Sequence, residues 1–493
     1  MNPIKLSRSD FPPLPESFEQ PHFDPGRVSH GIVHIGLGGF HRAHMARYTH
    51  DLMGVDEGAL EWGIIGAGLR SSDKPLLDVL RSQQGLYSLI EREGAIERRV
   101  VISSIIAAID ASESSDLLLA AIEDPQTRIV SMTVTENGYC LDRATKTLDL
   151  DNPEVAADIA NPTRPKSLPG ILVEAYRRRW RAGADAFTSL SCDNIQHNGN
   201  VLGAAILRLA THQDPELARW IEVHASFPNT MVDRITPVPT DGEIESFAAD
   251  TGIDDRASLH AELFRQWVIE DRFVAGRPAW EKVGAQFVDD VTPYEFMKLR
   301  LLNGSHLAIA AIGQLSGYAL ISETIEDPHI RRYMTALMDK ETGPTLSPVP
   351  GIDLTAYKRA LINRFANRAI KDTTQRVNTD APINVLVDPI RDRLATEQPI
   401  DLLALGLAAW IRRVSGADDQ GQPIKVVHPM AELLATKATE GGSDPTPVLS
   451  ITALFGSLGQ NPQLVAAVRY WLEMIYEKGI RSTMSTAVEL GVF

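Results

Sequence analysis

The sequence contains little cysteine and no long hydrophobic run. Its two cysteines, Cys140 and Cys192, form no C-x-x-C pair and lie in no cluster with the spacing of zinc ligands. We therefore expect no bound metal and no disulfide framework, which fits a reducing compartment. The apolar run 402–411 is too short to span a bilayer, which takes about 20 residues. Residues 1–25 are polar and proline-rich and lack the apolar core of a secretory signal, so we expect a cytoplasmic protein.

The charge of the chain limits its partners. The formal net charge is −16, so nucleic acid and an anionic membrane surface would be repelled. A chain of 493 residues is too long for one compact core, and two or three domains are expected. The sequence shows no internal repeat and no low-complexity segment. These features indicate a globular protein that has neither nucleic acid nor a membrane as a partner.

Two kinds of periodicity meet near residue 290. Before this point, short apolar runs alternate with helix-like stretches, which is typical of an α/β fold with a parallel sheet. The strand-like runs are 31–35, 62–65, 128–134 and 186–191, and the helix-like stretches include 115–122 and 171–181. After it, segments with a period of 3.6 residues dominate, at 294–318, 325–340, 354–372, 399–414, 427–438 and 462–478. The sequence predicts an α/β domain over 1–290 and a mostly α-helical domain over 291–493.

A glycine-rich turn follows the first strand-like run. Gly36, Gly38 and Gly39 come directly after it, and a helix-like segment follows. Glycines there allow a tight turn and a close approach of a pyrophosphate, which the helix N-terminus would stabilise. The third position of the usual G-x-G-x-x-G motif is His41, so the motif is incomplete. The turn predicts a Rossmann-type dinucleotide site, and a glycine turn without a ligand is the alternative.

An acidic residue, Asp73, follows the second strand-like run. A carboxylate there can bind the adenosine ribose hydroxyls and repel a 2′-phosphate, which predicts NAD rather than NADP. Asp73 lies 35 residues after Gly38, whereas about 20 is usual. Arg70 and Lys74 lie close by and could weaken the preference. A solvated loop carboxylate is the alternative interpretation.

The start of a helix is well specified at Thr292. Thr292 suits the N-cap, Pro293 the first helical position, and Glu295 completes a capping box. Tyr294 and Lys298 also match the Y-x-x-x-K pair of short-chain dehydrogenases. Those chains are about half as long and carry the pair inside the nucleotide domain, so we interpret this match as chance.

This helix could present a catalytic group of side chains. At about 100° per residue, Glu295, Lys298 and His306 fall within about 80° of one another, and Asn303 within about 140° of Lys298. Oxidation of a secondary alcohol needs a base for the hydroxyl proton, and a desolvated lysine can act as one. Asn303 and His306 could donate hydrogen bonds to the oxygen as it gains charge, without a metal. Each residue also has a simpler interpretation when it is considered alone. Lys298 could be a surface lysine, His306 a core or surface histidine, and Glu295 only a helix cap.

Several motifs together resemble the long-chain mannitol dehydrogenase family of polyol-specific dehydrogenases. They cover nearly the whole chain, and the Val-Asp-Arg-Ile-Thr-Pro and Lys-x4-Asn-Gly-Ser-His segments are highly specific. The segments that carry the resemblance are Gly36–His44, Gly68–Asp73, Thr133–Tyr139, Ser191–Asn194 with Asn198-Gly199, Phe227–Pro237, Arg277–Gly284 and Lys298–His306.

The resemblance implies a Rossmann-type N-terminal domain, a helical C-terminal domain, and a substrate held in the cleft between them. It implies NAD-dependent, metal-independent oxidation of a polyol to a ketose by a monomer or weak oligomer. Lys298 would be the base, Asn303, His306 and Asn194 would hold the reacting oxygen, and Glu295 would relay the proton to solvent. The remaining implied contacts are Asp233 and Arg376 with substrate hydroxyls, Glu136 near the proton exit, and Gly36, Gly38, Gly39, Phe40, Arg42, Asp73 and Glu136 with the cofactor.

One segment departs from the family pattern. After Arg376 the family usually carries a lysine before a proline-rich stretch, whereas this chain reads Val-Asn-Thr-Asp-Ala-Pro. The loss of that contact leaves mannitol, arabinitol, sorbitol or a rarer hexitol as substrates. Two alternatives remain: a fructuronate or tagaturonate reductase of the same family, and a non-catalytic nucleotide-binding sensor. The missing lysine argues against the first, because a carboxylate substrate favours a cationic pocket.

Overall fold

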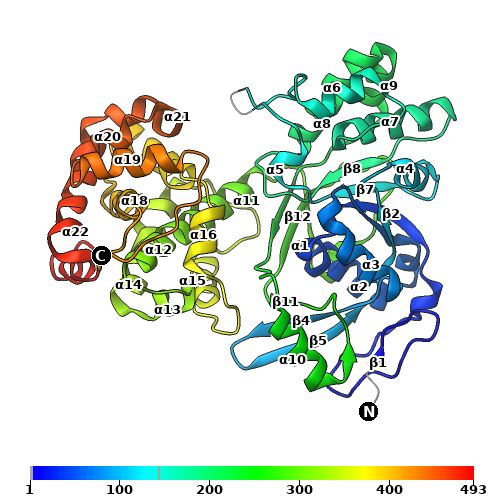
Figure 1. The fold of residues 1–493 in the computed structure, drawn as a ribbon, viewed down its shortest axis with the longest axis horizontal. Coiled ribbons are helices and arrows are strands. Elements are labelled where there is room, and N and C mark those ends of the chain that lie inside the picture. Colours follow the sequence, from blue (N-terminus) through cyan, green and yellow to red (C-terminus); the bar gives the residue numbers. More distant parts are fainter. Residues whose placement is uncertain (1–3, 143–144) are drawn as a thin grey trace. The chain divides into compact units, whose positions relative to one another are not determined.

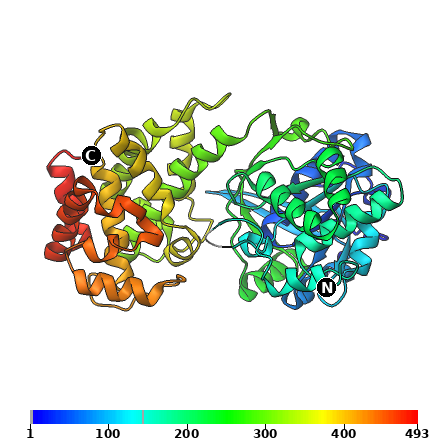
Figure 2. The same ribbon diagram turned by 90° about the horizontal axis from the view of Figure 1, so that it is seen from above.

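The computed structural model describes residues 4–142 and 145–493. The chain divides into two compact units, Met1–Thr292 and Pro293–Phe493. The first combines strands and helices, and the regular elements of the second are helices (Figures 1 and 2). Within the described residues, no helix has the length and hydropathy needed to cross a membrane.

A five-stranded parallel sheet forms the centre of the first unit. Its strands are β2 (His30–Ile35), β3 (Gly63–Gly68), β6 (Ile105–Asp110), β7 (Ile129–Met132) and β8 (Thr188–Ser191). They lie in the order β6-β3-β2-β7-β8, all parallel, so the order reverses between β2 and β7. This is the Rossmann arrangement, and the prediction of an α/β fold with a parallel sheet is confirmed. All four predicted strands are present, whereas β6 was not predicted.

Helices cover both faces of this sheet. Ile32 joins an apolar cluster with residues of α2 (Met45–Val55) and α3 (Lys74–Ser82). The neighbouring Val33 joins a second cluster, to which α4 (Asp116–Glu123), α7 (Leu168–Arg181), α8 (Asn198–Gln213) and α9 (Pro215–His224) contribute. Because consecutive residues of β2 point into different cores, the strand is apolar almost throughout. The predicted helices 115–122 and 171–181 correspond to α4 and α7.

Smaller sheets extend the first unit. One contains β9 (Thr230–Asp233), β12 (Gln266–Glu270) and β13 (Gln286–Val288), and another contains β4 (Tyr87–Glu93), β5 (Ile96–Ile102) and β11 (Leu259–Glu262). A two-stranded pair joins β1 (Ile4–Lys5) to β10 (Ile253–Asp254). The other short helices of this unit are α1 (Gly39–Ala43), α5 (Thr135–Gly138), α6 (Pro153–Ala160) and α10 (Asp241–Thr251).

The second unit is helical, as predicted, but its helices begin and end at other residues than those predicted. They are α11 (Thr292–Met297), α12 (Gly304–Leu315), α13 (Ile321–Glu326), α14 (Pro328–Ala336), α15 (Leu354–Phe365), α16 (Thr374–Asp380), α17 (Asn384–Ala395), α18 (Asp401–Val414), α19 (Ala431–Gly441), α20 (Thr446–Leu449), α21 (Thr452–Phe455) and α22 (Pro462–Glu489). The predicted helix 354–372 was too long, because α15 ends at Phe365 and the Asn367 side chain accepts the Ala369 N–H in the following turn. Helix α17 was not predicted.

Two π-helical turns interrupt the long helices of the second unit. The predicted helix 294–318 contains a π-helical turn, Lys298–Asn303, between α11 and α12. The predicted helix 325–340 runs from α14 into a second such turn, Leu337–Thr342. A π turn bonds residue i to i+5 and is rare, and it often occurs at functional sites. The wheel of 100° per residue used for 295–306 therefore does not hold across this turn.

Candidate functional site

The glycine turn lies where the strand order of the sheet reverses. Gly36 follows β2 with a φ of +92°, and a Cβ there would lie 2.0 Å from the Thr133 carbonyl oxygen at the end of β7. The Gly36 N–H donates to Ala67 O at 2.8 Å, which joins the turn to β3. Only glycine fits this position, because its φ is positive and a side chain would collide with the backbone. The predicted role of Gly36 in a tight turn is thus explained.

His41 replaces the third glycine of the dinucleotide motif. Its ring is buried and stacks on His34 of β2, with ring centroids 3.4 Å apart and an angle of 17° between the planes. His34 is held by Ser131 Oγ at 2.8 Å and Thr133 Oγ1 at 3.0 Å. Burial lowers the pKa of His34 to about 3 and that of His41 well below its usual value, so both rings are neutral. A flat, neutral ring thus allows the close approach of helix and strand that glycine usually provides.

A cavity of about 630 Å³ opens beside the glycine turn. Its walls include Gly36, Gly38, Asp73, Thr133 and Asn137. This volume is in the range of cofactor and ligand pockets, and its place at the switch point of the sheet is where such folds bind nucleotides. A Cβ on Gly38 would meet no atom within 4 Å, so a larger residue would project into open space there. These residues therefore fit a dinucleotide.

Asp73 lies at the predicted acidic position in this cavity. It ends the short 3-10 helix Ser71–Asp73, and its carboxylate accepts the Arg70 N–H at 3.1 Å. A Cβ on Gly68, the last residue of β3, would lie 2.7 Å from Asp73 Cβ. Gly68 therefore lets the Asp73 side chain lie against the end of the strand.

Asp193 fixes one wall of the cavity and was missed by the sequence analysis. Its buried carboxylate accepts the backbone N–H groups of Val134 and Thr135 at 3.1 and 2.8 Å and the Tyr139 hydroxyl at 2.7 Å. Thr135 has a φ of +63°, a conformation that a β-branched residue rarely adopts. Burial raises the pKa of Asp193, although these hydrogen bonds oppose the rise. The available signal was an acidic residue just after a buried strand, β8, beside the predicted Asn194.

Four other predicted cofactor residues are outside the walls of this cavity. Gly39 begins α1, and Phe40 stacks on His44 with ring centroids 4.9 Å apart. The buried guanidinium of Arg42 donates to Ala257 O. Glu136 is exposed on α5 and forms an ion pair with Lys146 Nζ at 2.8 Å. Each of these contacts is within the protein, so their assignment to the cofactor stays a prediction.

The predicted substrate residues of the first unit follow strands. Asp233 is the last residue of β9, is buried, and lies opposite Gln266 of β12. Asn194 is exposed three residues after the end of β8. Between them, the buried Asn198 donates to Asp193 O at 2.9 Å and to Thr230 O at 3.0 Å, which joins the ends of β8 and β9.

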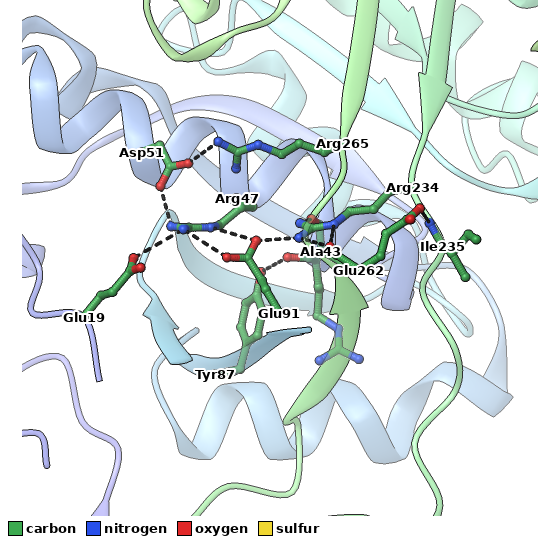
Figure 3. Close-up of polar contacts among 11 residues, drawn as sticks. Glu19, Ala43, Arg47, Asp51, Tyr87, Glu91, Arg234, Ile235, Glu262 and Arg265 are labelled. Carbon is green, nitrogen blue, oxygen red and sulfur yellow. Dashed lines mark hydrogen bonds and ion pairs between the residues drawn. The ribbon is translucent and has the colours of Figure 1, made fainter. Parts of the chain in front are cut away.

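A buried ionic network fixes the chain just after Asp233. The Arg234 guanidinium donates to Glu91 Oε1 at 2.5 Å, to Glu262 O at 2.6 Å and to Ala43 O (Figure 3). On its other side, Glu91 accepts from Arg47, whose guanidinium also reaches Glu19 and Asp51; Asp51 in turn pairs with Arg265 at 2.5 Å. Burial opposes ionisation of Glu91, but Arg47 and Arg234 lower its pKa to about 2. The network therefore ties the end of β9 to β4 and α2.

In the second unit, the predicted base lies in the π-helical turn. Lys298 is its first residue and is only 8% exposed; Asn303 is its last. Glu295 is buried one turn earlier in α11, and His306 is half-buried in the first turn of α12. Helix α11 begins at Thr292, one residue earlier than a Thr292 N-cap predicts, and the Asp290 carboxylate accepts the Thr292 N–H at 2.9 Å.

Tyr294 has a structural contact. Its hydroxyl donates to Pro350 O at 2.7 Å and its side chain is buried, which raises its pKa. This contact supports the interpretation of the Y-x-x-x-K match as chance, because the hydroxyl is already used within the helical unit.

Asp372 joins two of the predicted site residues and was also missed. Its Oδ2 lies 3.2 Å from His306 Nε2, within ion-pair distance. Both of its oxygens accept from Arg376, at 2.7 Å from Nε and 2.7 Å from Nη2. The signal in the sequence was the i, i+4 spacing of Asp372 and Arg376. Within the described residues, no group of three or more His, Cys, Asp and Glu side chains has an arrangement that could hold a metal ion.

The fold and the cavity define a class of protein. A parallel sheet in this order, with a glycine turn and a cavity at the switch point, is that of Rossmann-type dinucleotide-binding proteins. Residues 30–282 match the mannitol dehydrogenase Rossmann domain, and residues 290–476 match the mannitol dehydrogenase C-terminal domain. The chain therefore belongs to the mannitol dehydrogenase family and is an oxidoreductase by class.

Individual relatives resemble the chain over nearly its full length. D-mannonate oxidoreductase of Escherichia coli strain K12 is 43% identical over 94% of this chain and 97% of its own. The structure of Pseudomonas fluorescens mannitol 2-dehydrogenase in a ternary complex with NAD and D-mannitol has a TM-score of 0.89 at 40% identity, and covers 99% of this chain and 100% of that one. A substrate-free D-sorbitol dehydrogenase has a TM-score of 0.88 at 35% identity, and covers 98% and 100%.

Proposed function

We propose that the protein oxidises a secondary alcohol of a polyol to the ketose with NAD and catalyses the reverse reduction. The observation that carries this proposal is the burial of Lys298 in a π-helical turn of a helical domain of this family. Residues 1–290 would bind the cofactor, and residues 291–493 would supply the base and further substrate-binding groups.

NAD is the cofactor in this proposal. When bound, it takes a hydride from the carbinol carbon of the substrate. The open position of Gly38 and the positive φ of Gly36 suit the approach of a pyrophosphate to the backbone. Asp73 in the cavity wall would bind the adenosine ribose and disfavour a 2′-phosphate.

Lys298 is the general base. As the hydride leaves carbon, the hydroxyl proton moves to Lys298 Nζ and the C–O single bond becomes a carbonyl. Burial disfavours a charged ammonium group, which suits an amine that must accept a proton from the substrate. Glu295, buried one turn earlier on the same helix, would pass the proton toward solvent, with Glu136 near the exit.

Three donors would hold the reacting oxygen. Asn303, His306 and Asn194 carry N–H groups suited to an oxygen that gains negative charge. Asp233 and Arg376 would bind the other hydroxyls of the substrate, and Asn194 and His306 would share in substrate binding. The family and the burial of Lys298 support these roles.

A hexonate is the second candidate substrate, because the E. coli relative is a D-mannonate oxidoreductase. The surroundings of Arg376 favour a polyol instead. Arg376 already pairs with Asp372 and, at 3.0 Å, with Asp380, so its charge is neutralised within the protein. A substrate carboxylate would have to compete with these two carboxylates for the guanidinium.

A substrate panel tests the proposed function. C5 and C6 polyols and the corresponding hexonates are offered with NAD, and the appearance of NADH is measured. We expect oxidation of at least one polyol with a higher kcat/KM than of any hexonate. Preferential turnover of a hexonate would reverse the choice of substrate, and no turnover of either class would contradict the proposal.

The preference for NAD is tested separately with Asp73→Ala. The ratio of kcat/KM with NAD to that with NADP is measured before and after the substitution, with Asp78→Ala on α3, an exposed carboxylate outside the cavity walls, as the control. We expect Asp73→Ala to lower the ratio and Asp78→Ala to leave it unchanged. An unchanged ratio for Asp73→Ala would remove its assignment.

A further inference from the structure

We infer that Asp372 is a positioning residue that orients both His306 and Arg376 toward the substrate. The inference rests on the proposed function, in which these two residues bind the substrate. It adds a residue that touches neither substrate nor cofactor and acts through its two neighbours.

The geometry around Asp372 supports a fixed anchor. Its side chain is buried, and its backbone is held from both directions: its N–H donates to Ile370 O and its carbonyl accepts the Ile321 N–H, each at 2.9 Å. The carboxylate therefore has little freedom to follow a neighbour that moves. His306 comes from α12 and Arg376 from α16, two helices that pack against each other.

Asp372 restricts the orientation of both of its partners. The Arg376 side chain is 45% exposed, and a long exposed side chain loses considerable rotamer entropy when it is fixed. Two parallel hydrogen bonds to one carboxylate set the plane of the guanidinium as well as its distance. The His306 ring has Asp372 Oδ2 3.2 Å from its Nε2 and the Phe365 ring centroid 4.9 Å from its own centroid. Carboxylate and aromatic ring together define the orientation of the imidazole.

Asp372 also places a negative charge beside His306. Its Oδ2 lies 3.2 Å from His306 Nε2, within ion-pair distance. His306 and Arg376 lower the pKa of Asp372 well below its usual range despite its burial, so it is an anion at working pH. The charge of Asp372, as well as its fixed position, can therefore hold His306 and Arg376 in place.

The test compares Asp372→Asn with Asp380→Asn. Both carboxylates pair with Arg376, but Asp380 is 57% exposed, which makes it the matched control. We expect Asp372→Asn to lower kcat/KM for the polyol on the order of 10–100-fold, the cost typical of removing a group that orients a metal-ligating histidine. Asp380→Asn should change it less than about twofold, because surface pairs contribute little. The Kd for NADH, followed by fluorescence, should stay the same in both variants.

A double-variant series distinguishes positioning from a general structural role. Asp372→Asn is repeated in a His306→Ala background and in an Arg376→Ala background, and Asp372→Glu is added as a variant that keeps the charge. In each background its effect on kcat/KM should be a smaller factor than in the parent, because one of its two contacts is already lost. Asp372→Glu should recover part of the lost activity. Equal factors in all backgrounds, or no recovery by glutamate, would overturn the inference.

Failure of the inference and of the proposed function can be told apart. If His306→Ala and Arg376→Ala themselves keep the parent kcat/KM, the substrate roles in the proposed function are wrong. If they lose activity while Asp372→Asn keeps it, only the inference is overturned. Thermal unfolding shows whether Asp372→Asn folds. If it does not, Asp372→Glu takes its place in the series. Parent activity in both Asp372→Glu and Asp372→Ser would then overturn the inference.

Discussion

Two buried carboxylates, Glu91 in the first unit and Asp372 in the second, each lie beside two basic side chains. Glu91 lies between Arg47 and Arg234, both of which are almost wholly inaccessible to solvent (Figure 3). Asp372 lies between His306 and Arg376, and almost half of the Arg376 side chain is exposed. Both clusters pair a buried carboxylate with basic side chains, but their arginines differ in how far they are exposed to solvent.

This difference separates a structural cluster from a candidate site. A sealed ionic cluster can only hold chain segments together, because no ligand reaches its donors. An open cluster fixes the direction of its donors and still leaves a face for a ligand. The number of ion pairs would not distinguish the two clusters, whereas the exposure of the arginine does.

The largest effect is expected in the second unit, from Lys298→Ala. Removal of a general base should lower kcat by about 10²- to 10⁴-fold while NADH still binds. Lys340→Ala is the matched control, because Lys340 is an exposed lysine in the other π-helical turn. Steady-state oxidation of the polyol and fluorescence titration of NADH measure both quantities. Turnover by Lys298→Ala at the parent rate would refute the mechanism.

The pH dependence of alcohol oxidation by the unsubstituted protein also tests the role of Lys298 as base. We expect the rate of alcohol oxidation to rise as a single basic group loses its proton, because only the neutral amine accepts the hydroxyl proton. A flat profile from about pH 6 to 10 would count against a lysine base.

A substitution in the buried cluster of Glu91, Arg47 and Arg234 should lower the stability of the fold. Glu91→Gln leaves two buried arginines without their shared anion and should lower the free energy of unfolding by about 3–5 kcal/mol. Glu97→Gln on β5 is the control, because Glu97 also pairs with two arginines, Arg92 and Arg99, but near the surface; its effect should stay below about 1 kcal/mol. Urea unfolding measures both. Equal losses would show that burial does not distinguish these clusters.

A third buried carboxylate, Asp193, has neutral donors as partners and extends the comparison. Asp193→Asn removes one of the two carboxylate oxygens that accept the Val134 and Thr135 N–H groups in the cavity wall. Loss of one such bond costs about 1.4 kcal/mol, so the Kd for NADH should rise about tenfold. Asp149→Asn is the control, because Asp149 accepts a backbone N–H in a loop outside the cavity walls. An unchanged Kd would mean that this wall does not contact the cofactor.

The smallest effect is the pH dependence that Glu91 adds to stability. Its pKa in the folded protein is about 2, below the ordinary value of 4.5. A depressed carboxyl pKa contributes stability that is complete above pH 4.5 and is lost as the pH falls toward 2. Between pH 5 and 3, unfolding free energy should therefore fall more steeply in the parent than in Glu91→Gln. Parallel slopes would show that Glu91 is not ionised in the folded state at low pH.

The sequence predicted four strands of the central sheet of the first unit and most helices of the second unit. The strand-like runs were found because each lies between two cores, as Ile32 and Val33 show, and is rich in apolar and β-branched residues. In the helical unit, apolar periodicity identified most helices but not their ends or turns. Helices there begin or end where side chains such as Thr373 and Asn367 accept backbone N–H groups. The spacing of apolar residues does not reveal a π turn.

The site was predicted in part. Lys298, Asn303 and His306 could be named because they are close in sequence on one helical segment. The contact of Asp372 with His306 and those of Asp193 with the Val134 and Thr135 N–H groups could not, because the partners are 66, 59 and 58 residues apart in the chain. No local pattern links residues at such a separation.

By itself, the sequence determined that a glycine turn follows a buried strand, that the chain changes from α/β to helical near residue 290, and which helix carries the candidate base. These features depend on neighbouring residues and their periodicity. Tertiary structure alone decided that His41 stacks on His34, that a π turn surrounds Lys298, and that Asp372 faces His306. Those contacts arise from packing between distant segments, where burial and charge compensation select one arrangement that local propensity does not specify.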